Sequence, residues 1–273
     1  MSKEYIIDAD AGLQLADRLK ECWQRRDLIR MLTYRDIKVR YTQTALGMIW
    51  AVINPVISIL LLYFVFNVVM KVDTGGIPPL LFTVSGLCAW NYFSKVVGEA
   101  GTSIVGAQEL VKKIYFPRLV IPVSKSVSAI VEFIIVLILL FAMIIVYQYP
   151  VHEKFFLIVP FSLLLFIVGT GCGIWIAALT IRFRDFHYIV PVLLRIGMFV
   201  SPIAFGSQQV PEGFRWVVSL NPLTGIIDGF RYALFGIQPD MQTLLVSALV
   251  CIAICVSGVL YFLHMERHIA DIV

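Results

Sequence analysis

Long apolar runs alternate with polar, basic segments along the chain. These runs predict six membrane-spanning segments, at residues 48–70, 77–98, 120–147, 156–181, 188–205 and 242–263. A helix needs about 20 residues to cross the hydrocarbon core. We expect helices rather than strands, because a single helix satisfies its own backbone hydrogen bonds in lipid. The pattern predicts an all-α integral membrane protein whose fifth span is short and ends at Ser201-Pro202.

Composition supports a membrane protein and excludes several other classes. The 273 residues are 59% hydrophobic and 15% charged, with a mean hydropathy of +0.87. Soluble domains are about 25% charged, so a soluble enzyme, a disordered chain and a nucleic-acid-binding domain are all excluded. The five cysteines form no CxxC pair, and we therefore expect neither a disulfide framework nor a metal site.

The distribution of positive charge predicts the orientation. Of 22 Lys and Arg residues, 15 precede the first span or follow spans two, four and six, whereas four lie in the opposite loops. Positive charge collects on the cytoplasmic side, so both termini should be cytoplasmic. An even number of spans agrees with this orientation.

The N-terminal segment, residues 1–40, is expected to form a cytoplasmic unit ahead of the six-span domain, residues 41–273. Its apolar residues Leu15, Leu19, Cys22 and Trp23 share helical spacing, and Arg and Lys fill the other face. Such a helix lies in the plane of the membrane interface. It either anchors the chain to anionic lipid or offers a docking surface to a cytoplasmic partner.

Two further segments are too short or too polar to span. Residues 99–119 predict a cytoplasmic helix over about 103–116, ended by Pro117, and its exposed apolar side chains favour a protein contact over a plain basic loop. Residues 206–240 predict two short outer helices, one at 211–220 and one that begins at Asn221-Pro222 and ends at Gly236. We interpret residues 207–236 as a re-entrant hairpin that gates the exit.

The gate candidates are bulky or charged side chains of this hairpin. Asp228 and Arg231 can pair at i,i+3 in an exposed ion pair, and an apolar stripe should do most of the holding. The candidates are Phe214, Trp216, Asp228, Phe230 and Arg231.

Candidate chemistry within the chain is sparse. Residues 101–106 have the glycine spacing of a phosphate-binding loop but lack its lysine, so this chain should not hydrolyse ATP. We assign no catalytic residue. Glu132 lies inside the third span, where acids are costly and face a partner, and the candidate partners are Arg195 and Lys125. A structural ion pair is favoured over proton coupling.

Five stretches resemble, in order, the permeases of polysaccharide-exporting type-2 ABC transporters, which export O-antigen, capsule or teichoic acid. The stretches are residues 35–41 with Leu46-Gly47 and Trp50-Ala51, residues 111–118, residues 182–185 with Ile189-Val190-Pro191 and Ser201-Pro202-Ile203, Asn221-Pro222-Leu223 with Gly229-Phe230-Arg231, and residues 268–271.

The resemblance implies a homodimer of six-span subunits in the bacterial cytoplasmic membrane, with two separate ATPase subunits and a lipid-linked glycan, O-antigen being favoured. It implies no cofactor in this chain, and ATP and Mg in the partner. The residues implied to couple to the ATPase are Leu110, Val111, Lys112, Lys113, Tyr115, Phe116, Arg118, Arg35 and Asp36.

The resemblance also implies a channel along the dimer axis, lined by spans one and five. Aromatic side chains there could pack against the C–H faces of sugar rings, although aromatics also collect at membrane interfaces and face lipid. The lining candidates are Trp50, Tyr63, Phe64, Phe66, Phe199 and Phe205. Two alternatives stay open: export of small hydrophobic compounds, and a membrane enzyme acting on lipid-linked sugars.

Overall fold

The computed structural model describes residues 15–42, 47–113 and 116–272, and among these residues it contains helices and loops but no strand. Five helical stretches in this part of the chain are long and apolar enough to cross a membrane. They are α3 with its π-helical continuation η2 (Trp50–Val69), α4 (Pro79–Gly101), α7 (Val120–Val146), η3 with α8 (Phe155–Arg182), and α12 over Met241–Glu266. The all-α membrane fold is thereby confirmed.

The expected fifth span is shorter than the other five and is not among these stretches. Helix α9 (Phe186–Val200) has 15 residues and ends where Ser201 adopts an extended conformation, just before Pro202. The other elements are α1 (Leu15–Gln24), α2 (Arg26–Thr42), η1 (Gly47–Ile49), α5 (Ser103–Gly106), α6 (Gln108–Lys113), η4 (Ser207–Gln209), α10 (Glu212–Leu220) and α11 (Pro222–Phe235), and α12 itself continues to Ile272.

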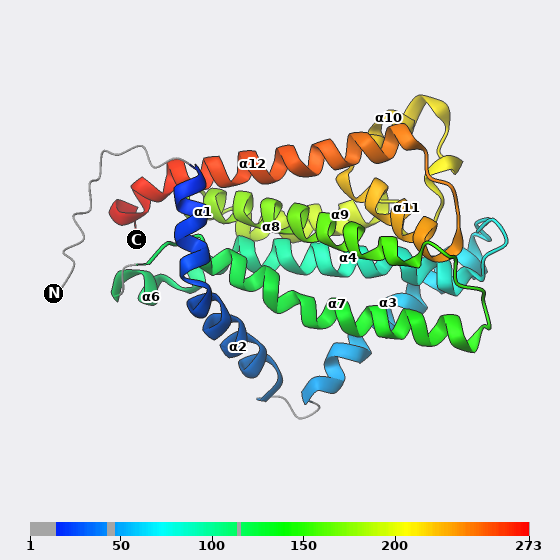
Figure 1. Cartoon of the computed structure of the whole chain (residues 1–273), viewed down its shortest axis with the longest axis horizontal. Helices are drawn as coiled ribbons and strands as arrows, with labels where there is room; N and C mark the ends of the chain where they lie inside the picture. The colour runs from blue at the N-terminus through cyan, green and yellow to red at the C-terminus, as the bar shows by residue number, and fades with distance from the viewer. Residues whose placement is uncertain (1–14, 43–46, 114–115, 273) are drawn as a thin grey trace.

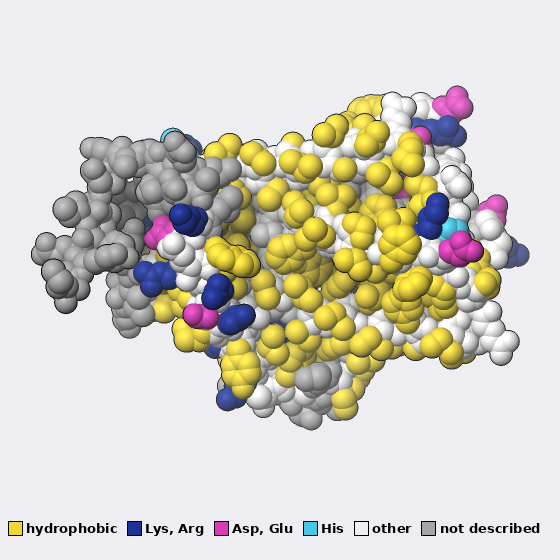
Figure 2. Space-filling model, viewed as in Figure 1, with side chains coloured by type: hydrophobic (Ala, Val, Ile, Leu, Met, Phe, Trp, Pro, Cys, Tyr) yellow, Lys and Arg dark blue, Asp and Glu magenta, His cyan; other side chains and the backbone are white. Residues whose placement is uncertain are grey.

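The long helices lie side by side along the longest axis of the molecule (Figure 1). Helices α1, α2 and α6 and the last turns of α12 lie at one end, which we call the terminal end. Helices α10 and α11 lie toward the opposite end, which we call the hairpin end. Hydrophobic side chains cover the middle of the face in Figure 2, and charged side chains gather toward its two ends. This banding is typical of a protein that crosses a membrane.

Helix α8 is packed between α4 and α12 and forms the centre of the bundle. A side chain at Gly171 would come within 2.6 Å of the Cα atom of Cys255 in α12, and one at Gly173 within 2.7 Å of Ala100 in α4. Small residues allow such close helix contacts in membranes. The GxGxG stretch of α8 is therefore a packing device.

Burial differs sharply between neighbouring spans. In the most apolar window of α4, 72% of the residues are buried, against 11% in the window of α3 and η2. Helix α9 likewise leaves most of one side uncovered, including Leu193, Ile196 and Phe199. Helices α3 and α9 thus lie at the periphery, with apolar faces that the described part of the chain leaves uncovered.

Local sequence signals explain several helix boundaries. Asn221 caps α11 by accepting a hydrogen bond from the amide of Leu223 at 3.0 Å, and Gly236 ends it in the left-handed conformation with φ of 76°. Pro79 stands at the first turn of α4. The prediction of a single helix over about 103–116 is wrong, because the helix is interrupted at Ala107 and forms two short helices, α5 and α6.

Candidate functional site

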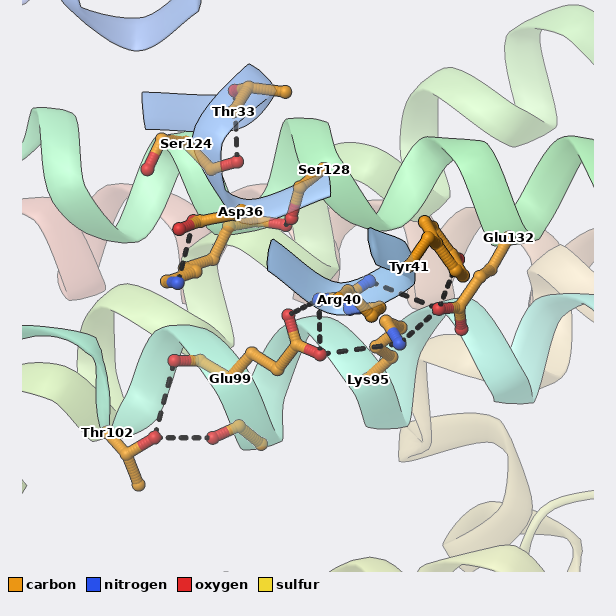
Figure 3. A network of polar contacts seen from close by, with 12 residues as sticks. Thr33, Asp36, Arg40, Tyr41, Lys95, Glu99, Thr102, Ser124, Ser128 and Glu132 are labelled. Carbon is orange, nitrogen blue, oxygen red and sulfur yellow. Dashed lines mark hydrogen bonds and ion pairs between the residues drawn. The ribbon is translucent and has the colours of Figure 1, made fainter. Parts of the chain in front are cut away.

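Four charged side chains form a network where α2, α4 and α7 meet (Figure 3). Glu132 of α7 accepts from Lys95 at 2.5 Å and from Arg40 at 3.1 Å. Arg40 also reaches Glu99 at 2.6 Å and 2.8 Å, and Lys95 lies 3.3 Å from Glu99. The hydroxyl of Tyr41 donates to Glu132 at 3.1 Å. Two cations and two carboxylates therefore neutralise one another; we call this set the charge network.

The side chains of the charge network are only partly screened by water. Those of Arg40, Lys95, Glu99 and Glu132 are between 20% and 31% exposed. Burial alone would lower the pKa of Arg40, but Glu99 and Glu132 outweigh burial, and the pKa is raised. Burial, followed by the charge of Glu132, raises the pKa of Tyr41. Arg40 is thus held charged and Tyr41 neutral.

A second set of contacts fixes α2 along α7. Asp36 is 9% exposed and lies 2.7 Å from the amine of Lys125, while Arg35 approaches Asp36 from the same helix at 2.9 Å. The hydroxyl of Thr33 donates to the carbonyl of Ser124 at 3.3 Å. Helix α2 is therefore fixed to α7 over its second half, by Thr33 and Asp36 near its middle and by Arg40 and Tyr41 near its C-terminal end.

The partners expected for Glu132 are wrong. Lys125 pairs with Asp36, and Arg195 points away from the bundle on the exposed side of α9. The expectation failed because α2, an interface helix in the sequence, supplies Arg40 to a carboxylate of the third span. A second carboxylate, Glu99, also belongs to the network. Lys95 and Glu99 could have been recognised as an i,i+4 pair on one helix face.

A polar pocket of about 570 Å³ opens beside the charge network. Its lining combines the expected coupling residues Arg35 and Asp36 with Arg40, Glu99 and Lys125, and α5 also contributes to the lining. The pocket therefore lies between α2 and the segment that follows α4.

The segment between α6 and α7 is more firmly packed than expected. Phe116 is 7% exposed and belongs to an apolar cluster with residues of α7, α8 and α12, against which Leu110 and Val111 also pack. The outward position expected for Phe116 is therefore wrong. Lys112 is exposed, and Arg118 donates to the carbonyl of Glu266 at 3.0 Å. Tyr115 and the side chain of Lys113 lie outside the described residues.

The aromatic residues proposed to line a channel divide into two groups. Trp50, Phe64 and Phe199 are 42%, 59% and 56% exposed on the uncovered faces of α3 and α9. Tyr63, Phe66 and Phe205 are half-buried, and Phe66 packs against the main core. Only the first group is positioned to meet a second molecule.

A buried arginine organises the hairpin end. The guanidinium of Arg231 donates to the carbonyl of Ile203 at 2.7 Å and to that of Phe205 at 3.1 Å, and it lies 3.6 Å from the centre of the Phe82 ring. Gly86 allows Ile203 to approach, because a side chain there would come within 2.6 Å of the Ile203 carbonyl. The non-helical residues after α9 are thus clamped between α4 and α11; we call this the arginine clamp.

The exposed Asp228–Arg231 pair expected from the sequence is wrong. The two side chains are 11% and 2% exposed and lie 3.7 Å apart, and Asp228 accepts from Ser207 at 2.5 Å. The i,i+3 spacing was correct, but tertiary packing of α11 against α4, α8 and α12 buries both partners. Phe230 is fully buried, whereas Phe214 and Trp216 of α10 are 66% and 64% exposed.

Comparison with known sequences gives consistent matches. Residues 27–235 match the family described as "ABC-2 type transporter". The chain is 26% identical to an O-antigen export system permease protein RfbA of Klebsiella pneumoniae, with 90% of this chain and 95% of that protein covered. It is 28% identical to RfbA of Myxococcus xanthus, with 86% and 91% covered. It is 26% identical to the polysialic acid transport protein KpsM of Escherichia coli, with 75% and 80% covered.

Proposed function

The chain belongs to the ABC-2 type transporter family, and from this we propose that it is the membrane-spanning permease subunit of an ATP-driven exporter of lipid-linked polysaccharide. The observation that carries the proposal is a similarity to O-antigen export permeases over nearly the full length of both chains. O-antigen is the favoured cargo, because two of the three relatives described are named for it. ATP and Mg would bind in a separate ATPase partner.

We propose six spans, with α9 as the fifth. At 1.5 Å per residue α9 rises about 22 Å, less than the hydrocarbon thickness of about 30 Å. Residues 202–205 then continue toward the hairpin end without helical hydrogen bonds. Irregular backbone is tolerated at membrane depth where it is buried in protein, and Arg231 satisfies two of its carbonyls. This supports a broken fifth span.

The hairpin of α10 and α11 would re-enter the outer leaflet, with both termini in the cytoplasm. Helix α11 has 14 residues and is too short to span, and it is buried against three of the long helices. The exposed aromatic residues of α10, Phe214 and Trp216, would gate the exit. The excess of Lys and Arg on the other side of the spans supports this orientation.

The terminal end would receive the ATPase. Helix α1 is amphipathic and, with α2, would lie at the membrane interface. The short helices α5 and α6 would contact the partner through exposed positions such as Lys112. Phe116 is buried in the apolar cluster and would not itself touch the partner. The pocket beside Arg35 and Asp36 links this contact to the spans. Helix α2 crosses the domain boundary expected at residue 40 and packs on α7, so the two proposed domains meet here.

A homodimer would bury the uncovered faces of α3 and α9. Both expose long apolar side chains that include Trp50, Phe64 and Phe199. Two copies joined along these faces would place the aromatics at a central path, where sugar rings could slide past without tight binding.

Deletion and complementation in the native bacterium test this function. Loss of the gene should leave completed glycan on its lipid carrier inside the cell, and the wild-type gene should restore surface display. Normal display in the deletion strain, with a changed tolerance to small hydrophobic compounds, would instead favour the drug-export alternative. Glycan that reaches the surface but is chemically altered would favour the membrane enzyme.

A further inference from the structure

A second, apolar cavity, open to the outside along the exposed side of α9, lies between α9 and the rest of the bundle. Its volume is about 670 Å³, within the range of small-molecule sites. None of the residues that line it carries a charge. Its walls are formed by Trp90 and Phe93 of α4, Trp175 of α8, Leu194 and Val200 of α9, and Ile254 of α12.

The cavity lies at membrane depth. Helices α4, α8 and α12 are all candidate spans, and their middle turns form three of the walls. Along α9 the lining runs from Val190 to Val200, about 15 Å at 1.5 Å per residue. That length equals half of the hydrocarbon thickness of about 30 Å, which is the depth that one lipid chain occupies.

Water is a poor occupant of this cavity. The amide of Asn221 donates to the hydroxyl of Ser201 at 2.9 Å, and its oxygen accepts from Leu223. The indole N–H of Trp175 donates to Ser257 at 3.0 Å. The main polar groups of the lining therefore have partners already, whereas a buried water needs several. An empty space of this size would forfeit the contacts of every side chain around it.

We propose that this cavity binds one acyl chain of a membrane phospholipid. The chain would pack between Trp90 and Trp175 on the bundle side and Leu194 and Val200 on the α9 side. It would act as a wedge that separates α9 from α4 and α8, which explains why the fifth helix makes few contacts with either. The site does not depend on which cargo the transporter moves.

Tryptophan fluorescence in brominated lipid tests the site. Trp90 is 5% exposed, so lipid that merely covers the outer surface makes little contact with it. A variant that keeps Trp90 and carries Phe at the other four tryptophans is reconstituted in phosphatidylcholine brominated at the middle of its chains. We expect a clear loss of fluorescence relative to the unbrominated lipid, because the bound chain brings bromine against the ring.

Two further variants separate occupation from general exposure. Leu194→Phe with Val200→Phe narrows the cavity and should restore much of the fluorescence. Ile196→Phe changes the exposed side of the same helix, outside the cavity lining, and should leave the quenching unchanged. If the single-tryptophan chain does not fold, the same two variants are compared in the wild-type background.

The proposal is overturned if Trp90 fluoresces equally in both lipids, or if the narrowed variant is quenched as strongly as the control. Equal fluorescence together with a cross-link between copies through a cysteine placed at Leu194 would show that a second copy of the chain fills the cavity instead.

Discussion

The charge network and the arginine clamp solve the same problem, charge inside a membrane protein, in different ways. At the terminal end, Arg40, Lys95, Glu99 and Glu132 neutralise one another through four ion pairs and remain partly exposed. At the hairpin end, Arg231 is nearly inaccessible and donates hydrogen bonds to two backbone carbonyls. In the first arrangement each charge has two opposite charges within reach, whereas in the second a single buried cation holds the backbone.

The difference indicates what each end is suited to do. A set of partly exposed ion pairs on three helices can exchange partners as α2 moves, because each charge has two opposite charges within reach. A buried cation that satisfies irregular backbone cannot move without leaving polar groups unpaired. We therefore expect the terminal end to rearrange when the ATPase acts and the hairpin end to hold its shape.

Removal of Arg231 should have the largest effect on stability. Arg231→Met leaves Asp228 without a charge partner and frees the carbonyls of Ile203 and Phe205, so it should cost about 3–5 kcal/mol, measured by unfolding in mixed micelles. The matched control is Arg215→Met, whose pair with Glu212 is exposed and should contribute little. Equal stabilities of the two variants would show that the clamp is not a structural contact.

The charge network should show a smaller effect that a second substitution reverses. Glu132→Gln leaves an excess positive charge beside Lys95 and should cost about 1 kcal/mol. Adding Lys95→Met restores neutrality around the remaining Arg40–Glu99 pair, so the double variant should be more stable than Glu132→Gln alone. Asp27→Asn serves as the control. Asp27 pairs with Arg30, and both side chains are largely exposed to solvent, so the stability should hardly change. Simple additivity of the two network substitutions would contradict mutual neutralisation.

The exposed aromatics of α10 should matter for transport but not for folding. Phe214→Ala with Trp216→Ala removes side chains that make few contacts within the chain, so unfolding should change by no more than about 0.5 kcal/mol per site. If these residues close the exit, proteoliposomes of the double variant should leak small solutes. A double variant that still exports and shows no added leak would contradict the gating role, and the hairpin would then only cover the ends of the spans.

The last effect is local and depends on pH, and it is expected at the start of α12. Asp240 accepts from the hydroxyl and the amide of Thr243 at 2.7 Å and 3.1 Å, and these bonds lower its pKa. A carboxylate with a lowered pKa stabilises the fold above the unfolded pKa of about 3.9 and loses this contribution as the pH falls through the folded value. Asp240→Ala should cost about 0.5–1 kcal/mol at pH 7. Asp240→Asn should keep the cap without the acid loss, measured by unfolding between neutral and acidic pH.

The sequence was sufficient for features that depend on local patterns. The apolar runs predicted the long helices, and Asn221, Pro222 and Gly236 marked α11 at both ends, because capping and helix-breaking act within a few residues. The i,i+3 spacing of Asp228 and Arg231 was also visible.

Features that depend on the packing of distant helices could not be predicted. Arg40 and Glu132 are separated by 92 positions, and nothing in their local sequence connects them. The burial of Phe116 and Arg231 depends on which helices cover them, which periodicity does not reveal. The polar contacts of the charge network and of the arginine clamp are therefore the part of the site that could be found only from the structure.

Transport by purified components tests the central claim, export of lipid-linked polysaccharide, most directly. The chain and its proposed ATPase partner are reconstituted in vesicles that carry lipid-linked O-polysaccharide on one face, and the appearance of glycan on the other face is followed. Movement should require both subunits and ATP, and the chain alone should show no ATP hydrolysis. ATP turnover by the chain alone, or ATP-dependent movement of small hydrophobic compounds with the glycan left in place, would contradict the account.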